Sequence, residues 1–322
     1  MALLEVKDLK MHYETRDGPV HAVDDISFVL EKGKVLGLAG ESGSGKSSIA
    51  ITLLRLLPGN GKIIQGGVFL DGEDIANIPE STLRKDIRWK RISLISQAAM
   101  NALNPVFRIG DQIREAIITH SEVDKESAEA NARELLEEVG IPADRYSSYP
   151  HELSGGMRQR TMIAMALALN PDIVIADEPT TALDVIVQAQ ILVLLRGLQR
   201  SKKMAMILIT HDLSLVAEMC DNVAIIYGGQ IVEFGSASQL FHNPRHPYTI
   251  GLIKSFPSLE AKKSRLSSIP GSPPDLVHPP IGCRFAARCP YATSKCTGQD
   301  PHLDEVERGH FAKCWYAGEM HL

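Results

Sequence analysis

The stretch Gly40–Ser48, with the sequence GESGSGKSS, decides the fold of this 322-residue chain. It follows the apolar run 35–39 and precedes a helical apolar pattern that begins at Ile49. A strand therefore leads into a glycine-rich loop and then into a helix, which matches the phosphate loop G-x-x-x-x-G-K-[ST]. The alternative, a glycine turn before an ordinary helix, is disfavoured because a strand and a helix flank the loop on the expected sides. We predict that the chain binds a nucleoside triphosphate.

The chemistry of this loop follows from its backbone. Glycine reaches φ values that are closed to other residues, so successive N–H groups can turn inward around an oxyanion. The helix start adds free donors and the positive end of its dipole. Lys46 is expected to reach the β- and γ-phosphates, and the Ser47 hydroxyl to ligate Mg²⁺. The predicted nucleotide contacts in the loop are Gly40, Ser42, Gly43, Gly45, Lys46, Ser47 and Ser48.

Composition narrows the class of protein. A hydrophobic content of 44% and a charged content of 23% are ordinary for a globular protein. The net charge of −5 gives no general attraction to nucleic acid or to anionic lipid. No apolar run approaches the roughly 18 residues of a membrane span, and the N-terminus lacks the layout of a signal peptide. We expect a cytosolic chain that reaches a membrane only through membrane partners.

Apolar patterns divide the rest of the chain into strands and helices. An aromatic residue, Tyr13, ends the first strand; it can stack on adenine or be a half-buried strand residue. Gln97 directly follows a short buried strand. Residues 109–120 and 124–139 have helical spacing and form a helical insertion in an α/β chain. Strands are predicted at 3–13, 20–30, 91–96 and 204–210, and hairpins at 62–75 and at 222–235.

The peptide LSGGMRQR, residues 153–160, opens another helix. Ser154 is a good N-cap, and Gly155 and Gly156 leave the helix start uncovered by side chains. This predicts a second anion-binding helix terminus. A capped helix without a ligand is the alternative, and it would be favoured if the peptide stood alone.

A third segment, residues 172–177, is a β-branched apolar run of the kind found in parallel strands buried on both faces. Carboxylates at the end of such a strand lie where open α/β sheets place their ligands. Asp177 is suited to hold Mg²⁺, and Glu178 to orient or deprotonate the attacking water. His211 follows the next predicted strand and is expected to be functional rather than structural.

These motifs occur in one order and together resemble the nucleotide-binding subunit of an ABC transporter over residues 1–240. The resemblance implies an α/β phosphate-loop ATPase with a parallel core sheet, an antiparallel β subdomain and a helical subdomain at about 98–165. It implies adenine stacking for Tyr13, and contacts of Gln97 with Mg²⁺ and the transporter. It also implies catalysis by Glu178 with Lys46, Gln97 and His211. The residues expected to act across a dimer are Ser154, Gly155 and Gly156, which would bind the other subunit's ATP, and Asp184.

Residues 241–322 resemble the C-terminal extension of dipeptide/oligopeptide-type importer ATPases. This implies a peripheral subunit at the cytoplasmic membrane face, in a heterodimer with a related ATPase. Its further partners would be two permease subunits and, indirectly, an extracellular substrate-binding protein, but no nucleic acid. Expected cargo is di- or oligopeptides, with nickel chelates or oligosaccharides as alternatives; a soluble non-transport ABC ATPase is disfavoured. Ala98 and Ala99 depart from the acidic residue and proline usual after the glutamine.

Four of the five cysteines cluster near the C-terminus, whereas Cys220 stands apart and reads as a packed thiol. In a reducing cytosol a cysteine cluster indicates metal ligation, and four thiolates can hold zinc. The gaps of five, six and seventeen residues lack the close pairs of zinc knuckles and suit a 4Fe–4S cluster, which some relatives carry. We therefore expect an irregular, metal-binding extension with four ligands, Cys283, Cys289, Cys296 and Cys314.

Overall fold

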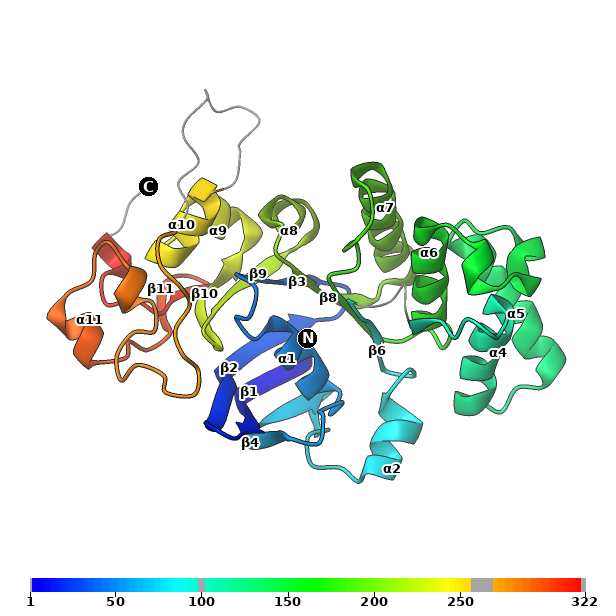
Figure 1. Ribbon diagram of the computed structural model, residues 1–322, viewed down its shortest axis with the longest axis horizontal. Coiled ribbons are helices and arrows are strands. Elements are labelled where there is room, and N and C mark those ends of the chain that lie inside the picture. Colours follow the sequence, from blue (N-terminus) through cyan, green and yellow to red (C-terminus); the bar gives the residue numbers. More distant parts are fainter. Residues whose placement is uncertain (1, 98–101, 256–268, 320–322) are drawn as a thin grey trace. The chain divides into compact units, whose positions relative to one another are not determined.

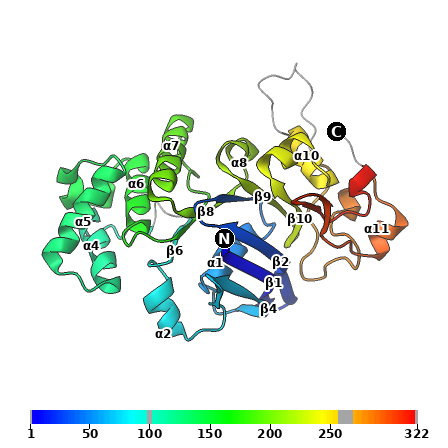
Figure 2. The same cartoon turned by 180° about the vertical axis from the view of Figure 1, so that it is seen from behind.

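The computed structural model describes residues 2–97, 102–255 and 269–319 (Figures 1 and 2). Ala98 and Ala99 therefore lie outside the described residues. No helix in the described part is long and apolar enough to cross a membrane. The chain divides into two compact units, each described by itself. Unit 1 holds the described residues within Met1–Leu30, Val35–Asn77 and Leu208–Leu322, and unit 2 holds Glu31–Lys34 and Ile78–Ile207.

An antiparallel sheet forms the N-terminal part of unit 1. A bulge at Asp8, whose φ is +48°, shifts the register of the first strand. Because of this shift the buried side chains change from Leu4 and Val6 to Leu9 and Met11, and all four are withdrawn from solvent. The predicted strands and the hairpin are confirmed. The strand order is β2-β1-β4-β5, with β1 Ala2–Thr15, β2 Gly18–Glu31, β4 Gly61–Leu70 and β5 Glu73–Asp74.

A second set of strands in unit 1 carries the phosphate loop. Strand β3 (Val35–Ala39) is buried throughout and runs parallel to β9 (Asn222–Tyr227). Cys220 is packed against β3, and burial raises the pKa of its thiol to about 12, so the prediction of a packed thiol is confirmed. Helices of unit 1 are α1 Lys46–Leu53, α8 Leu213–Met219, α9 Ala237–His242, α10 Pro247–Ser255 and α11 Ser294–Gly298.

The C-terminal extension is less irregular than expected, because it continues this sheet. Strand β12 pairs antiparallel with β10, matching Glu233 with Ala312, and β11 pairs with β12. The buried Glu233 carboxylate accepts a hydrogen bond from His310 at 2.7 Å and ties the two strands together. The strands are β10 Gln230–Ser236, β11 Asp304–Glu307 and β12 His310–Ala312.

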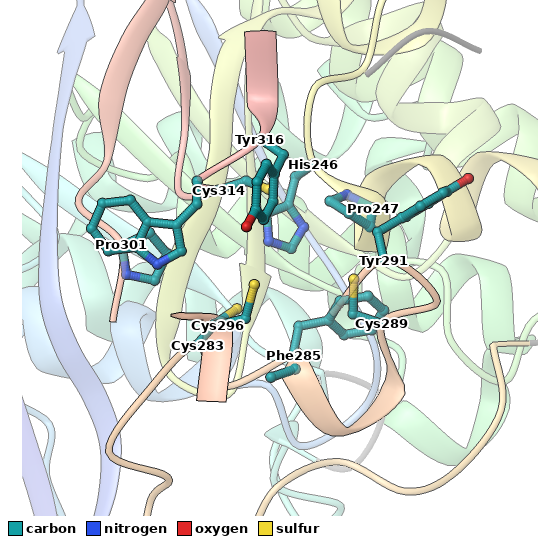
Figure 3. Close-up of a pocket in the computed structure, with 12 residues that line it drawn as sticks. His246, Pro247, Cys283, Phe285, Cys289, Tyr291, Cys296, Pro301, Cys314 and Tyr316 are labelled. Carbon is teal, nitrogen blue, oxygen red and sulfur yellow. The ribbon is translucent and has the colours of Figure 1, made fainter. Parts of the chain in front are cut away.

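The expectation of a metal-binding extension is wrong. Within the described ranges, no group of three or more histidine, cysteine or acidic side chains is placed to hold a metal ion. The four cysteines do line one cavity, of about 20 Å³, among aromatic side chains, with Cys289 apart from Cys283 and Cys296 on the side of Tyr291 (Figure 3). That volume accommodates about one water molecule.

Burial also affects the protonation of three of these thiols. Burial raises the pKa of Cys283 and of Cys314 to about 11 each, and it also raises the pKa of Cys289. Without a bound metal these three side chains are therefore neutral thiols at neutral pH. The spacing in the sequence thus predicted the thiol cavity, but the described residues include no group of side chains placed to hold a 4Fe–4S cluster or zinc.

Unit 2 contains the strand that ends at the two predicted carboxylates, together with a group of helices. Strand β7 (Ile173–Asp177) is buried throughout and pairs parallel with β6 (Ile92–Ile95). Helices α4 and α5 lie side by side next to α6 (Figures 1 and 2), which confirms the predicted helical insertion. The helices are α2 Glu80–Thr82, α4 Ile109–His120, α5 Lys125–Glu138, α6 Gly155–Ala166 and α7 Val185–Lys202. Strand β8 (Ala205–Thr210) carries the chain from unit 2 back to unit 1.

Candidate nucleotide site

The phosphate loop in unit 1 leaves β3 and turns directly into α1. Three of its residues, Gly40, Gly43 and Gly45, have φ of +150°, +77° and +106°. A Cβ atom at Gly40 would overlap the carbonyl oxygen of Ile226, and one at Gly45 would overlap that of Ala22. Glycine is therefore required twice, for the conformation and for the close backbone approach.

The start of α1 has no side-chain cap. Gly45 precedes it in a left-handed conformation, and no side chain of the described residues forms a capping hydrogen bond there. The first N–H groups of a helix lack intrahelical partners and carry partial positive charge. The loop and the first turn of α1 therefore form an anion-binding cradle.

The Lys46 side chain lies inside this loop and is hydrogen-bonded to it. Its side chain is 5% exposed, and Nζ donates to the carbonyl oxygens of Gly40 at 2.9 Å and Glu41 at 2.8 Å. A third, longer contact of 3.4 Å joins Nζ to the hydroxyl of Ser44. The ammonium group thus lies across the loop that would surround a phosphate.

Tyr13 lies beside the same helix. Its phenol oxygen is 3.1 Å from the hydroxyl of Ser48, and its side chain is half-buried at the end of β1. The structure brings Tyr13 and the phosphate loop together in unit 1, although they are far apart in the sequence. Both readings of Tyr13, an adenine platform and a strand residue, are compatible with this position, so adenine stacking stays a prediction.

In unit 2, strand β7 ends at two carboxylates with different surroundings. Asp177 closes β7 and is 6% exposed, whereas Glu178 has a φ of +47°, a left-handed conformation that is uncommon for a non-glycine residue. Oε2 of Glu178 accepts hydrogen bonds from Nε2 of Gln97 at 2.8 Å and from Oγ1 of Thr181 at 2.9 Å. The structure therefore unites Gln97 with Glu178. Thr181 was missed from the sequence, where no pattern distinguishes it.

The peptide LSGGMRQR and the segment after β7 also meet in unit 2. Ser154 caps α6, because its hydroxyl accepts a hydrogen bond from the Met157 N–H at 3.3 Å. A Cβ atom at Gly156 would come within 2.7 Å of Val187 at the start of α7. The N–H of Val187 in turn donates to the carboxylate of Asp184 at 2.9 Å. The predicted residues of the two segments are thus adjacent.

His211 belongs to unit 1, where it follows β8 directly and its side chain is exposed. The next residue, Asp212, caps α8 by accepting a hydrogen bond from the Ser214 N–H at 2.8 Å. The N–H of Asp212 donates to the hydroxyl of Thr210, which fixes the turn at the strand tip. His211 is thus held at a strand end, as predicted.

Comparison with known proteins identifies the arrangement. The ABC transporter family matches residues 23–181, and the family of oligopeptide/dipeptide transporter C-terminal regions matches residues 232–296. The oligopeptide transport ATP-binding protein OppD of Haemophilus influenzae is 47% identical over 98% of this chain and 98% of its own. The chain belongs to the ABC transporter ATP-binding subunits.

A second relative and a solved structure support the same family. The dipeptide transport ATP-binding protein DppD of Escherichia coli is 45% identical over 98% of this chain and 97% of its own. A solved structure, the dimeric ATP-binding cassette MJ0796 in a post-hydrolysis state with ADP and Pi, aligns with a TM-score of 0.65 at 25% identity. It covers 73% of this chain and 98% of MJ0796. The predicted ABC ATPase architecture and ATPase activity are thus confirmed.

Proposed function

We propose that this chain is the ATP-hydrolysing motor subunit of an importer of di- and oligopeptides. The observation that carries the proposal is the full-length similarity to OppD and DppD proteins, which extends through the C-terminal region. Similarity of the nucleotide motifs alone would support only the ABC family. Because the extension matches as well, the peptide-transport branch is favoured over importers of oligosaccharides or nickel chelates.

In the proposed ATP site, Lys46 and the backbone N–H groups in the first turn of α1 bind the phosphates, and Tyr13 stacks on adenine. The position of Lys46 across the loop supports the first role, and the second follows the family resemblance, with Tyr13 beside α1 through its contact with Ser48. The family resemblance assigns Mg²⁺ to Ser47 of unit 1 and to Gln97 and Asp177 of unit 2, which each carry an oxygen of the kind that Mg²⁺ prefers; bound Mg²⁺ would neutralise charge on the phosphates. The remaining loop contacts are Gly40, Ser42, Gly43, Gly45 and Ser48.

Hydrolysis in this proposal depends on Glu178, which orients the attacking water and accepts its proton. Gln97 and Thr181 donate to one oxygen of this carboxylate and thereby fix its direction. A fixed base avoids reorganisation during the proton transfer. His211 contacts the γ-phosphate and reports its presence.

The proposed assembly requires a second, related ATPase. Ser154, Gly155 and Gly156 would bind the γ-phosphate of ATP held by that partner, and Asp184 would contact the partner. Two integral membrane permease subunits anchor the pair at the cytoplasmic membrane face, and an extracellular binding protein delivers cargo to them. Because Ser154, Gly155 and Gly156 serve the partner's ATP, the chain alone should be a weak ATPase.

We assign residues 1–240 to the nucleotide-binding domain and residues 241–322 to the extension.

The test is transport by the reconstituted complex. The chain, its partner ATPase and both permeases are placed in proteoliposomes with the binding protein, and uptake of labelled di- and oligopeptides is measured. We expect ATP-dependent peptide uptake that Glu178→Gln abolishes. Uptake of oligosaccharides or nickel chelates without peptide uptake would contradict the proposed cargo. Full ATPase activity from homodimers of this chain would contradict the heterodimer.

A further inference from the structure

Glu41, the second residue of the phosphate loop, is held from three directions within unit 1. Its N–H donates to the phenol oxygen of Tyr248 at 2.8 Å, and its carbonyl oxygen accepts from Lys46 Nζ at 2.8 Å. Its carboxylate forms a two-pronged ion pair with Arg288, with Nη1–Oε2 and Nη2–Oε1 distances of 2.7 and 2.9 Å. Two of these three partners, Tyr248 and Arg288, come from the C-terminal extension.

Arg288 is itself fixed by the extension, independently of the loop. Nε donates to the carbonyl oxygen of Pro270 at 2.8 Å, and Nη2 makes a longer contact of 3.3 Å with that of Ile269. Nη1 also lies 3.3 Å from the hydroxyl of Tyr227. The Arg288 side chain is only 5% exposed. The guanidinium therefore presents its charge from a preformed position, and its side-chain entropy is already lost before the loop is engaged.

The charge of this pair matters because of where it lies. An unpaired carboxylate on the phosphate loop would repel the phosphates of ATP, and screening by solvent would be incomplete because the Glu41 side chain is only 27% exposed. Hydrogen bonds to the Glu41 carboxylate raise the pKa of Arg288, so the guanidinium remains charged and neutralises Glu41 at every physiological pH. The same ion pair fixes the residue whose carbonyl oxygen holds Lys46.

We propose that Arg288 is a positioning residue of the ATP site, through which the C-terminal extension sets the affinity of the phosphate loop for ATP. It acts by neutralising Glu41 and by fixing the loop turn that holds Lys46. The proposal rests on ATP binding by the phosphate loop, as proposed above, but not on the nature of the cargo. It gives the extension a role in the ATPase reaction itself.

A double-mutant cycle tests this role on the full-length chain, with a fluorescent ATP analogue as the binding probe. Arg288→Met leaves Glu41 charged and should weaken binding about tenfold. Glu41→Gln removes the repelling charge, while Arg288 keeps its contacts in the extension, so binding should stay within about threefold of wild type. The double variant should also stay within about threefold, because Glu41→Gln rescues Arg288→Met.

The steady-state rates of the assembled transporter give a second readout. Arg288→Met should raise KM for ATP about tenfold and leave kcat within about twofold, since Arg288 does not touch the reacting atoms. A double variant as weak as Arg288→Met alone would show that the pair only holds the fold together. Unchanged binding by Arg288→Met would also overturn the proposal.

The matched control is another ion pair of the extension that does not touch the phosphate loop. Lys313 and Asp300 are 2.8 Å apart, with Lys313 only 12% exposed. Lys313→Met should leave ATP binding unchanged, and a loss equal to that of Arg288→Met would contradict a specific role. If Arg288→Met does not fold, Tyr248→Phe removes one hydroxyl from Glu41 and should weaken binding about threefold; no change would overturn the proposal.

Lys46→Ala separates failure of this inference from failure of the ATP site. Loss of ATP binding in Lys46→Ala, together with wild-type binding in Arg288→Met, would refute the role of Arg288 and leave the ATP site intact. Retained ATP binding in Lys46→Ala would refute the proposed phosphate loop chemistry.

Discussion

The phosphate loop of unit 1 and the turn after β7 in unit 2 both require left-handed backbone, but they use different residues. In the loop, φ is +77° at Gly43 and +106° at Gly45, whereas in the turn it is +47° at Glu178 and +66° at Ala182. A left-handed conformation is free for glycine and costs other residues about 1–2 kcal/mol. The loop offers backbone N–H groups and needs no side chain there. The turn must present a carboxylate, so it retains the strain.

The largest expected effect comes from removing the charge of Glu178. Glu178→Gln keeps an acceptor for Gln97 and Thr181 but removes the basic oxygen. ATP hydrolysis by the assembled transporter should slow by about 10²–10⁴-fold, the usual contribution of a general base. Equilibrium binding of ATP should stay within about threefold of wild type.

Thr181→Val serves as the control for this variant. It removes one of two donors to the Glu178 carboxylate while the base remains, so hydrolysis should fall by only about two- to fivefold. A near wild-type rate for Glu178→Gln would show that another group accepts the proton.

A methyl group on the phosphate loop should have the next largest effect. In Gly45→Ala the added Cβ overlaps the carbonyl oxygen of Ala22, so the loop must move as a whole. ATP affinity should fall by about 100-fold, the scale of effect expected when binding groups are displaced by about 1 Å. Isothermal titration with ATP measures this change.

Gly72→Ala separates overlap from backbone strain. Gly72 has a φ of +85° in the turn between β4 and β5, and a Cβ there has no neighbour within 4 Å among the described atoms. Gly72→Ala should lower stability by about 1–2 kcal/mol and leave ATP affinity unchanged. If Gly45→Ala bound ATP like Gly72→Ala, the close approach of the loop to Ala22 would have no functional meaning.

Much of the nucleotide site was predictable because each motif is continuous in the sequence. The phosphate loop, the Ser154 cap and the carboxylates after β7 each follow from a local pattern of glycines, caps and apolar runs. The contact between Glu41 and Arg288 has no such signal, since 247 positions separate the two residues. Only folding of the extension onto the loop brings them together.

The cysteine cluster shows a different limit of sequence reasoning. Spacing predicted four thiols near one another, and all four do line one cavity. Ligation also requires that the donor atoms converge, and among the described residues no group of three or more such side chains is placed to hold a metal ion. The pairing of β12 with β10 was missed for a different reason. A strand of three residues is too short to show the alternation of apolar and polar side chains that predicts a strand.

The smallest expected effect tests the strain in the turn after β7. In Ala182→Gly the left-handed φ becomes free, and the higher entropy of glycine in the unfolded chain offsets part of the gain. We expect a net stabilisation of about 0.5–1 kcal/mol. The matched control is Lys203→Gly, at the end of α7, where φ is +53°. It should stabilise unit 2 equally, as measured by urea denaturation.

The two glycine variants should differ in activity. Ala182 follows Thr181, which donates to Glu178, so a glycine at 182 lets the turn sample conformations in which the carboxylate is misdirected. ATP hydrolysis by the assembled transporter should fall about two- to threefold in Ala182→Gly and stay unchanged in Lys203→Gly. Equal activity of both variants, each more stable than wild type, would mean that the strain at Ala182 does not help to hold Glu178. The turn after β7 would then function with glycine next to its reactive side chain, as the phosphate loop does with glycine next to Lys46.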